Sequence, residues 1–342
     1  MSVILFYSPF DQRSRDTESL MIAFKNQGHK VISLSQAGGA QIHDYLAQYQ
    51  IETYTHIIPG EPNWRYILRH LRFLLSFIRK HQVQVVYSHL ESANIVAALA
   101  QYFTKAKVYV VRHHINEAKL RGFDRSRTYR LTYALAKKII VVSEHAKKFM
   151  VEEEKINPGK IIHINLAYDF NIYNRPDPEN VRRIKAGFDG LTLLTVCRLT
   201  PFKRPENAIK TLDHLRHRGV RVRLILLGRG EEEEPIKAMV RDANLVDHVV
   251  MPGYVGNVLD YMAASHFLVH PSVLESSCVT VKEAALVQLP VIVCKGIGDF
   301  DDYIVHEKKW FCPGPRCVCR SGRRCDRRIQ VQGHVDDHDT VA

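Results

Sequence analysis

Short apolar runs alternate with longer amphipathic stretches from the first residue to about residue 305. Ten of these runs are rich in Val, Ile and Leu, and each predicts a strand. Those in the first half are Val3–Tyr7, Lys30–Leu34, Gln82–Tyr87, Lys107–Val111 and Lys138–Val142. Those in the second half are Leu191–Cys197, Arg221–Leu227, His248–Met251, His266–His270 and Pro290–Cys294. Because such apolar strands need cover on both faces, the pattern predicts an α/β chain with two doubly wound parallel sheets in series.

Two stretches interrupt this alternation and set the expected domain boundaries. Residues 169–189 contain two prolines, several Asn and Asp, and few apolar side chains. They predict a linker between an N-terminal domain, residues 1–168, and a second domain, residues 190–308. From residue 309 to residue 342 the sequence has neither the two-residue alternation of a strand nor the 3.6-residue period of a helix, and six Arg stand among few aliphatic residues. We therefore expect a disordered tail.

The composition is that of a soluble globular protein, with 46% hydrophobic and 25% charged residues among 342. Disordered and collagen-like chains are thereby excluded. No apolar run approaches the ~20 residues that span a bilayer, and the N-terminus lacks the basic segment of a secretion signal. We therefore expect a cytoplasmic protein. The net charge of +12 favours anionic partners such as nucleotides, phospholipid headgroups or nucleic acid.

Two glutamates follow the strand predicted at His266–His270. Glu275 lies just after that strand, and Glu283 lies inside the next predicted helix. Ligands of doubly wound sheets bind at the carboxyl ends of the strands, where free helix amides suit a phosphate. A carboxylate at this edge can accept hydrogen bonds from sugar or ribose hydroxyls. Two solvated surface glutamates are the alternative.

Two cations follow the strand predicted at Leu191–Cys197. Arg198 and Lys203 lie in the loop before the next helix, where they could meet the oxygens of a diphosphate. Ordinary surface charges at a strand end are the alternative interpretation.

Taken together, these segments resemble the retaining GT-B glycosyltransferases of the family-4, group 1 type, over residues 1 to about 308. The family's G-R-L-x-x-x-K-G loop corresponds to CRLTPFKR at residues 197–204, and its E-x7-E motif to Glu275 and Glu283. Between them, LILLGRG, MPGYV and ASHFLVHPS are similar to further family segments. The resemblance implies two Rossmann-like domains, the second incomplete at its C-terminal end.

The resemblance also implies a nucleotide diphosphate-sugar donor, transferred with retention to a hydroxyl acceptor. Arg198 and Lys203 would contact the diphosphate, Glu283 the ribose hydroxyls and Glu275 the donor sugar. Three small residues replace the family's G-F-G and could offer backbone amides to phosphate: Ser276, Ser277 and Cys278. No cofactor or metal is expected, because the family is usually metal-independent.

Histidines follow two further strands. His113 and His114 follow the strand at Lys107–Val111, where the family often places a histidine near the donor sugar and acceptor. A catalytic role and a loop-positioning role stay open for this pair, as does the choice between the two residues. His89 is expected to be structural. The loop SPFDQRSRD after the first strand lacks the family's glycines, which weakens the expectation of donor contacts from it.

Residues 64–81 predict an amphipathic helix. Its cationic stripe comprises Arg65, Arg69, Arg72, Arg79 and Lys80. Its apolar stripe comprises Ile67, Leu68, Leu71, Leu74, Leu75 and Ile78. Such a helix on the acceptor-side domain would suit a lipid-linked acceptor at an anionic inner leaflet, although an ordinary surface helix has the same pattern.

The tail from residue 309 is predicted to be a frameshifted translation. The family continues with Asn-Gly-Phe where this chain has KKWF, and removing one adenine from the Lys codons would turn Lys-Trp-Phe into Asn-Gly-Phe. A zinc site is the alternative, although the spacing of its four candidate ligands is not the usual paired form. These ligands would be Cys312, Cys317, Cys319 and Cys325. The activity of the chain in this form is left open.

Two other functions stay open at this stage. A nucleotide-sugar 2-epimerase of similar fold would need acidic and His residues facing the sugar in both domains. A basic, non-catalytic binding protein is the second alternative. We expect as partners a nucleotide-sugar donor, a saccharide or lipid-linked acceptor and an anionic membrane, but no nucleic acid, in the synthesis of cell-surface polysaccharide or glycolipid.

Overall fold

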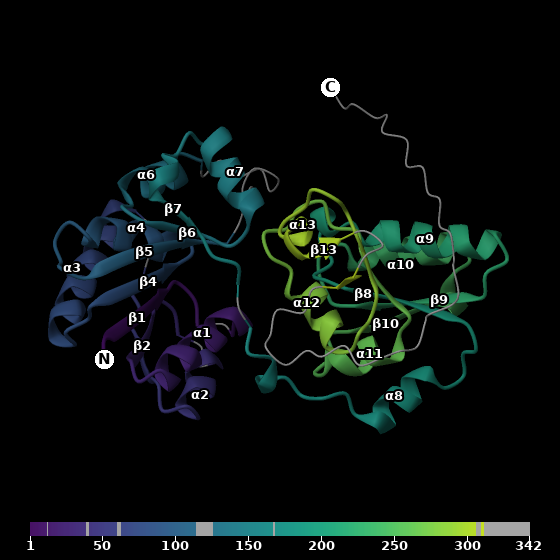
Figure 1. Cartoon of the computed structure of the whole chain (residues 1–342). Coiled ribbons are helices and arrows are strands. Elements are labelled where there is room, and N and C mark those ends of the chain that lie inside the picture. The colour runs from purple at the N-terminus through teal and green to yellow at the C-terminus, as the bar shows by residue number, and fades with distance from the viewer. Residues whose placement is uncertain are drawn as a thin grey trace. The chain divides into compact units, whose positions relative to one another are not determined.

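The computed structural model describes residues 1–11, 13–38, 41–59, 63–113, 126–166, 168–305 and 309–310. All ten predicted strands are present close to their expected bounds, in two parallel sheets (Figure 1). The strands of the first sheet are β1 (Val3–Ser8), β2 (Lys30–Ser35), β3 (Glu52–Thr55), β4 (Val85–His89), β5 (Lys107–Arg112), β6 (Ile139–Val141) and β7 (Ile161–His163). The strands of the second sheet are β8 (Leu191–Val196), β9 (Val222–Leu227), β10 (Val249–Gly253), β11 (Phe267–His270) and β12 (Val291–Val293). The two predicted doubly wound sheets are thereby confirmed.

The two sheets share the order of their first five strands, to which the first sheet adds β6 and β7. The first runs in the order β3-β2-β1-β4-β5-β6-β7 and the second in the order β10-β9-β8-β11-β12. In each sheet the first three strands follow one another toward one edge, and the later strands are added on the other side of the first strand, β1 or β8. The reversal lies between β1 and β4 in the first sheet and between β8 and β11 in the second. At such a reversal the loops at the carboxyl ends diverge and leave space for a ligand.

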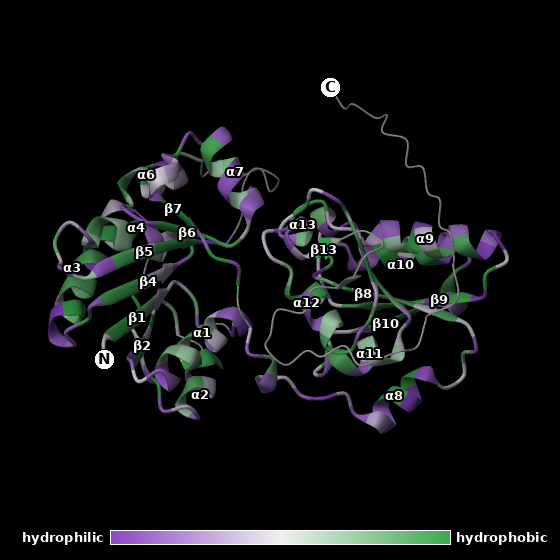
Figure 2. Ribbon diagram, viewed as in Figure 1, coloured by the Kyte–Doolittle hydropathy of each residue, from purple (hydrophilic) through white to green (hydrophobic). Residues whose placement is uncertain are grey.

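Helices cover both faces of the first sheet. They are α1 (Arg15–Asn26), α2 (Gln41–Ala47), α3 (Trp64–Lys80), α4 (Glu91–Ala100), α6 (Ser126–Leu135) and α7 (Glu144–Glu152). Successive side chains of β1 point to opposite faces: Leu5 and Tyr7 pack in a core with α3 and α4, whereas Ile4 and Phe6 pack with α1 and α2. This explains why β1 is apolar along most of its length, which Figure 2 shows in green.

The second sheet is covered in the same way. Its helices are α8 (Pro178–Lys185), α9 (Pro205–His217), α10 (Glu233–Asp242), α11 (Val258–Ala264), α12 (Val279–Leu286) and α13 (Phe300–Tyr303). Leu193 packs in a core with α9 and α10, and its neighbour Leu194 packs with α11 and α12. Each face therefore has its own apolar core.

The stretch expected to be a linker contains a helix. Asp177 caps the N-terminus of α8 by accepting a hydrogen bond from the Glu179 amide at 3.0 Å, and Pro178 supplies the preset φ of a first helical residue. Asp260 on α11 accepts hydrogen bonds from the Asp177 amide at 2.7 Å and from the Asn180 side chain at 3.2 Å. These bonds attach α8 to the helices of the second sheet.

Helix α3 matches its prediction except at one residue. Asn63 accepts hydrogen bonds from the amides of Arg65 and Tyr66, which sets the first turn. Leu68 was assigned to the apolar stripe, but it is 39% exposed and lies among the arginines, because it falls between the buried positions of successive turns. No helix in the described part of the chain has the length and hydropathy to cross a bilayer.

The last described residues form a strand pair. β13 (Ile304–Val305) pairs antiparallel with β14 (Lys309–Trp310), so the first two residues of the expected tail belong to a strand. The rest of the tail, with its four cysteines, lies outside the described residues.

Candidate functional site

A pocket of about 510 Å³ lies where the strands of both sheets end. Its walls come from the loops that follow β1, β5, β6 and β7 of the first sheet, and β8 and β11 of the second. Six residues predicted from the sequence line it: His113, Arg198, Lys203, Glu275, Ser276 and Ser277. The two loops of the second sheet leave the strands β8 and β11, which flank its topological reversal. The pocket is therefore where this topology places a ligand.

Glu275 is the best-connected carboxylate of the pocket. It is buried, and its Oε1 accepts hydrogen bonds from Lys203 Nζ and from His270 Nε2, the latter at 2.6 Å. Burial opposes the charge on Glu275, but His270 and Lys203 outweigh this effect and lower the pKa of its carboxyl. Glu275 is therefore a fixed anion at neutral pH.

His270 completes this network and was not predicted from the sequence. Burial disfavours its charged form, yet Cys278, whose Sγ lies 3.6 Å from Nε2, and Glu275 raise the pKa of His270 to about 10. His270 is the last residue of β11, and a histidine at the end of an apolar strand suggests only a core residue. The short distance in sequence between His270 and Glu275 was the only signal that could have indicated a role in the site.

The backbone next to Glu275 leaves no room for a side chain. Gly298 has a φ of +60°, and a Cβ built on it would lie 2.7 Å from Glu275 Cβ. A glycine is thus required both for the left-handed conformation and for the close approach. The backbone of Gly298 therefore packs directly against the Cβ of Glu275.

Arg198 and Lys203 are held by a loop that is pinned to the end of β9. The Leu199 amide donates a hydrogen bond to the Arg229 carbonyl at 3.0 Å, and the Cys197 amide donates one to the Leu227 carbonyl at 3.1 Å. Arg198 is exposed to the pocket, whereas Lys203 is bonded to Glu275. The two predicted cations therefore reach the same pocket with different partners.

The amide of Cys278, the residue just before α12, has a hydrogen-bond partner inside the protein. This amide donates to Asp299 Oδ1 at 3.4 Å, and Ser277 Oγ donates to Asp299 Oδ2 at 2.7 Å. Asp299 is almost fully buried and also binds Lys282. Cys278 does not line the pocket and its amide has an internal carboxylate as a partner, so a contact between this amide and a phosphate stays a prediction.

Glu283 lies on α12 but does not line the pocket. Burial raises the pKa of its carboxyl, although Arg15 and Tyr173 act in the opposite direction. Its role toward a ribose stays a prediction.

The loop after β1 and the first turn of α1 contribute more to the pocket than their sequence suggested. Arg13, Ser14, Arg15 and Asp16 all line the pocket. Arg13 forms a bidentate pair with the fully buried Glu18, at 2.8 and 2.9 Å. The missing glycines therefore do not keep this segment away from the pocket, and donor contacts from it stay a prediction.

His113 is held by two protein groups. Its Nε2 is 2.9 Å from His89 Nδ1, and its Nδ1 is 3.8 Å from Asp16 Oδ2. Burial lowers the pKa of both imidazoles, that of His89 to about 3, so both rings are neutral at pH 7. Since both nitrogens of His113 face protein groups, the geometry favours a positioning role, and His89 ties the ends of β4 and β5 together. His114 lies outside the described residues.

One group of side chains has the donor atoms and spacing of a metal site. The imidazole of His270, the carboxylate of Glu275 and the thiol of Cys278 place ligand atoms within 4.8 Å of one another. Lys203 and His270 already share one carboxylate oxygen, so a cation bound there would have to displace them. The hydrogen-bond network accounts for the cluster without a metal.

Two sequence families match the chain. Residues 178–316 match the model of the family described as Glycosyl transferases group 1, and residues 15–171 match that of Glycosyltransferase Family 4. The chain is 25% identical over 241 residues to an uncharacterized glycosyltransferase of Methanocaldococcus jannaschii, covering 66% of this chain and 59% of that protein. It is 26% identical over 222 residues to EpsF of Bacillus subtilis, covering 62% and 57%. The chain thus spans less than two thirds of the length of these curated relatives.

Solved structures show the same fold. HepE of Anabaena, crystallised with UDP, superposes with a TM-score of 0.74 at 19% identity, covering 90% of this chain and 84% of that one. Sucrose-phosphate synthase of Thermosynechococcus elongatus superposes with a TM-score of 0.69 at 15% identity, covering 89% and 84%. At these identities the likeness shows the fold, which is GT-B.

Proposed function

Because this chain belongs to the group 1 glycosyltransferases, we propose that it transfers a sugar from a nucleotide diphosphate-sugar donor to a hydroxyl acceptor with retention. The observation that carries the proposal is the pocket at the carboxyl ends of both sheets, which collects Arg198, Lys203 and Glu275. The binding of UDP by HepE, a protein of the same fold, supports a nucleotide donor.

Each side chain has a task that follows from its charge. Negative charge develops on the diphosphate as the glycosidic bond breaks, and a fixed cation favours that state over the ground state. Arg198 is free to take this role, and Lys203 can share its charge between phosphate and Glu275. Glu275 then faces the positive charge that develops on the sugar ring. Side chains suffice for this scheme, and it assigns no step to a metal or cofactor.

Retention follows in this scheme from attack on the same face as the departing diphosphate. The acceptor hydroxyl can lose its proton to a leaving phosphate oxygen as the new bond forms, so no second carboxylate is required. Glu283 would contribute by accepting hydrogen bonds from the ribose, which requires α12 to face the nucleoside.

A second function is favoured by one specific observation. A nucleotide-sugar 2-epimerase needs acidic and His residues from both halves, and the pocket holds Asp16 and His113 from the first half beside Glu275 from the second. Epimerisation would act on the donor alone, whereas transfer consumes an acceptor.

We further propose that the acceptor is presented at an anionic membrane surface, in the synthesis of cell-surface polysaccharide or glycolipid, with the protein at the inner face. The support is the exposed face of α3, whose arginines form no ion pair with any described residue. Trp64, 65% exposed, and Leu68 lie on that face and could enter the headgroup layer.

Product analysis tests the proposed function. With UDP-glucose as the first donor probe and a mixture of hydroxyl acceptors, we expect UDP release that depends on the acceptor, and a product with the donor's anomeric configuration. Conversion of the donor into its C2 epimer, without acceptor and without net release of UDP, would favour the epimerase. An inverted product would contradict retention.

A further inference from the structure

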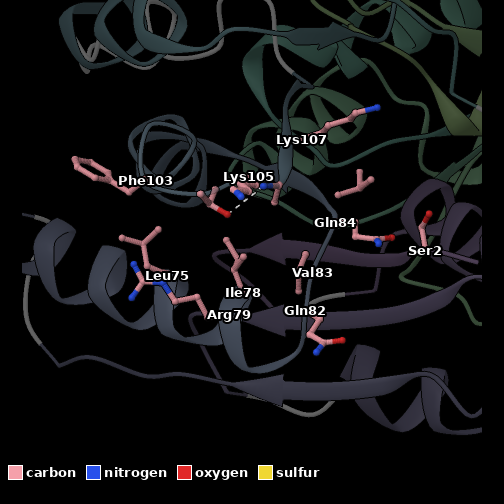
Figure 3. A pocket seen from close by; sticks show the side chains of 13 residues that line it. Ser2, Leu75, Ile78, Arg79, Gln82, Val83, Gln84, Phe103, Lys105 and Lys107 are labelled. Carbon is pink, nitrogen blue, oxygen red and sulfur yellow. Dashed lines mark hydrogen bonds between the residues drawn. The ribbon is translucent and has the colours of Figure 1, made fainter.

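A second pocket, of about 610 Å³, lies at the opposite edge of the first sheet (Figure 3). It is lined by the end of α3 and by residues that precede β1, β4 and β5. Because β4 and β5 each span roughly 17–20 Å, this pocket is separated from the one at the carboxyl ends by the height of the sheet. It is therefore not a part of the donor site.

One wall of this second pocket is apolar. The buried Ile78 and Val83 form its floor, and the half-buried Leu75 and Val85 and the exposed Phe103 form its surface. Phe103 is 61% exposed and belongs to none of the core clusters in the described part of the chain. Its ring is therefore open to contact with a ligand in the pocket.

The charged residues that line the pocket are all cations: Arg79, Lys105 and Lys107. None of the three forms an ion pair with a described residue, and no Asp or Glu lines the pocket. Arg79 also complements the C-terminal dipole of α3, a role that the two lysines do not have. In Figure 3, Arg79 lies beside Leu75, and Lys107 extends outward from the hollow. The pocket thus combines an apolar wall with positive charge that lacks an internal partner.

The pocket begins at the C-terminal end of α3. Leu75, Ile78 and Arg79 come from the last turns of that helix, whose earlier turns carry Arg65, Arg69 and Arg72 toward solvent. Of the three pocket residues only Arg79 is exposed, and helical spacing places it on the same side as Arg72. A membrane surface along that side would therefore meet the pocket at Arg79.

We propose that this pocket binds one anionic phospholipid of the membrane on which α3 lies. The phosphate lies between Arg79 and Lys105, and the first acyl carbons lie against Leu75 and Phe103. Charge complementarity selects an anionic ligand, and the apolar surface of Leu75 and Phe103 selects an amphiphile over free phosphate, which would leave these two side chains in water. The inference rests on the proposed membrane contact of α3 and names the lipid chemistry that anchors it.

The test uses dihexanoyl phosphatidylglycerol below its micelle concentration, titrated into the purified chain. We expect saturable binding of one lipid per chain, and binding at least about tenfold weaker in Lys105→Glu and several-fold weaker in Phe103→Ser. Matched substitutions on the second half, Lys210→Glu and Val246→Ser, and the helix variant Arg69→Glu should retain the wild-type affinity. Binding that is absent, or that weakens equally in Arg69→Glu, overturns the inference.

Two further arms distinguish the sources of the ligand. Glycerol phosphate should bind far more weakly than the short-chain lipid, and equal affinity would indicate a free-phosphate site and overturn the inference. Vesicles of phosphatidylglycerol and phosphatidylcholine should bind the chain, less well after Arg69→Glu, whereas vesicles of phosphatidylcholine alone should not. If anionic vesicles fail to bind, or if a protein or nucleic acid competes for the pocket instead, the membrane-lipid assignment is wrong. UDP titration of the same preparations tests the donor site separately.

Discussion

The Glu275→Gln variant is expected to lose about 100- to 1,000-fold in turnover while its affinity for UDP changes by less than about threefold. An amide keeps the shape of the carboxylate, but it removes the negative charge that faces the sugar ring as positive charge develops there. It also leaves Lys203 and the protonated His270 without their shared anion. The comparison of turnover number with UDP dissociation constant therefore separates stabilisation of the transition state from binding.

Thermal unfolding of the same variant provides the control for folding. A turnover equal to wild type, or a loss of turnover matched by an equal loss of UDP affinity, would contradict the role of Glu275.

The Gly228→Ala variant is expected to lower the free energy of unfolding by about 3–5 kcal/mol. Gly228 has a φ of +125°, and a Cβ built on it would lie 1.8 Å from the carbonyl oxygen of Cys197. Two backbones must therefore separate at the point where the loop carrying Arg198 leaves the sheet. We expect weaker UDP binding in whatever fraction of this variant folds.

Gly256→Ala is the matched control, because its added Cβ meets nothing within 4 Å and its φ lies outside the left-handed region. Denaturant unfolding of the two variants gives the comparison. Equal midpoints would show that the close contact between Gly228 and Cys197 is not required.

The predictable part of the fold is the part that is buried on both faces. The central strands are continuous apolar runs, so their positions follow from the sequence. β3 and β7 escaped prediction because they are edge strands: Glu52–Thr55 alternates exposed and half-buried side chains, and Ile161–His163 is only half-buried. For these strands hydrogen bonding to a neighbour, rather than an apolar run, decides the conformation.

The predictable part of the site consists of residues that follow their strands directly. Arg198, Lys203 and Glu275 are of this kind, since the topology alone brings them to one edge. Arg13 and Asp16 were missed because they reach the pocket from a segment far away in the sequence, the end of the loop after β1 and the first turn of α1. The use of the Cys278 amide by Asp299 could not be predicted either, because it depends on which buried carboxylate lies beside the start of α12.

Calorimetric titration of the chain with UDP and with uridine, compared between wild type and Arg198→Ala, tests the central claim most directly. Arg198 should touch only phosphate, so its loss should cost roughly 1.5–3 kcal/mol of UDP binding, about 10- to 150-fold, and leave uridine binding unchanged. Lys210→Ala, which removes an exposed cation from α9, should leave both affinities unchanged. A failure of wild type to bind UDP more tightly than uridine, or an equal loss for both ligands in Arg198→Ala, would contradict a diphosphate site in this pocket.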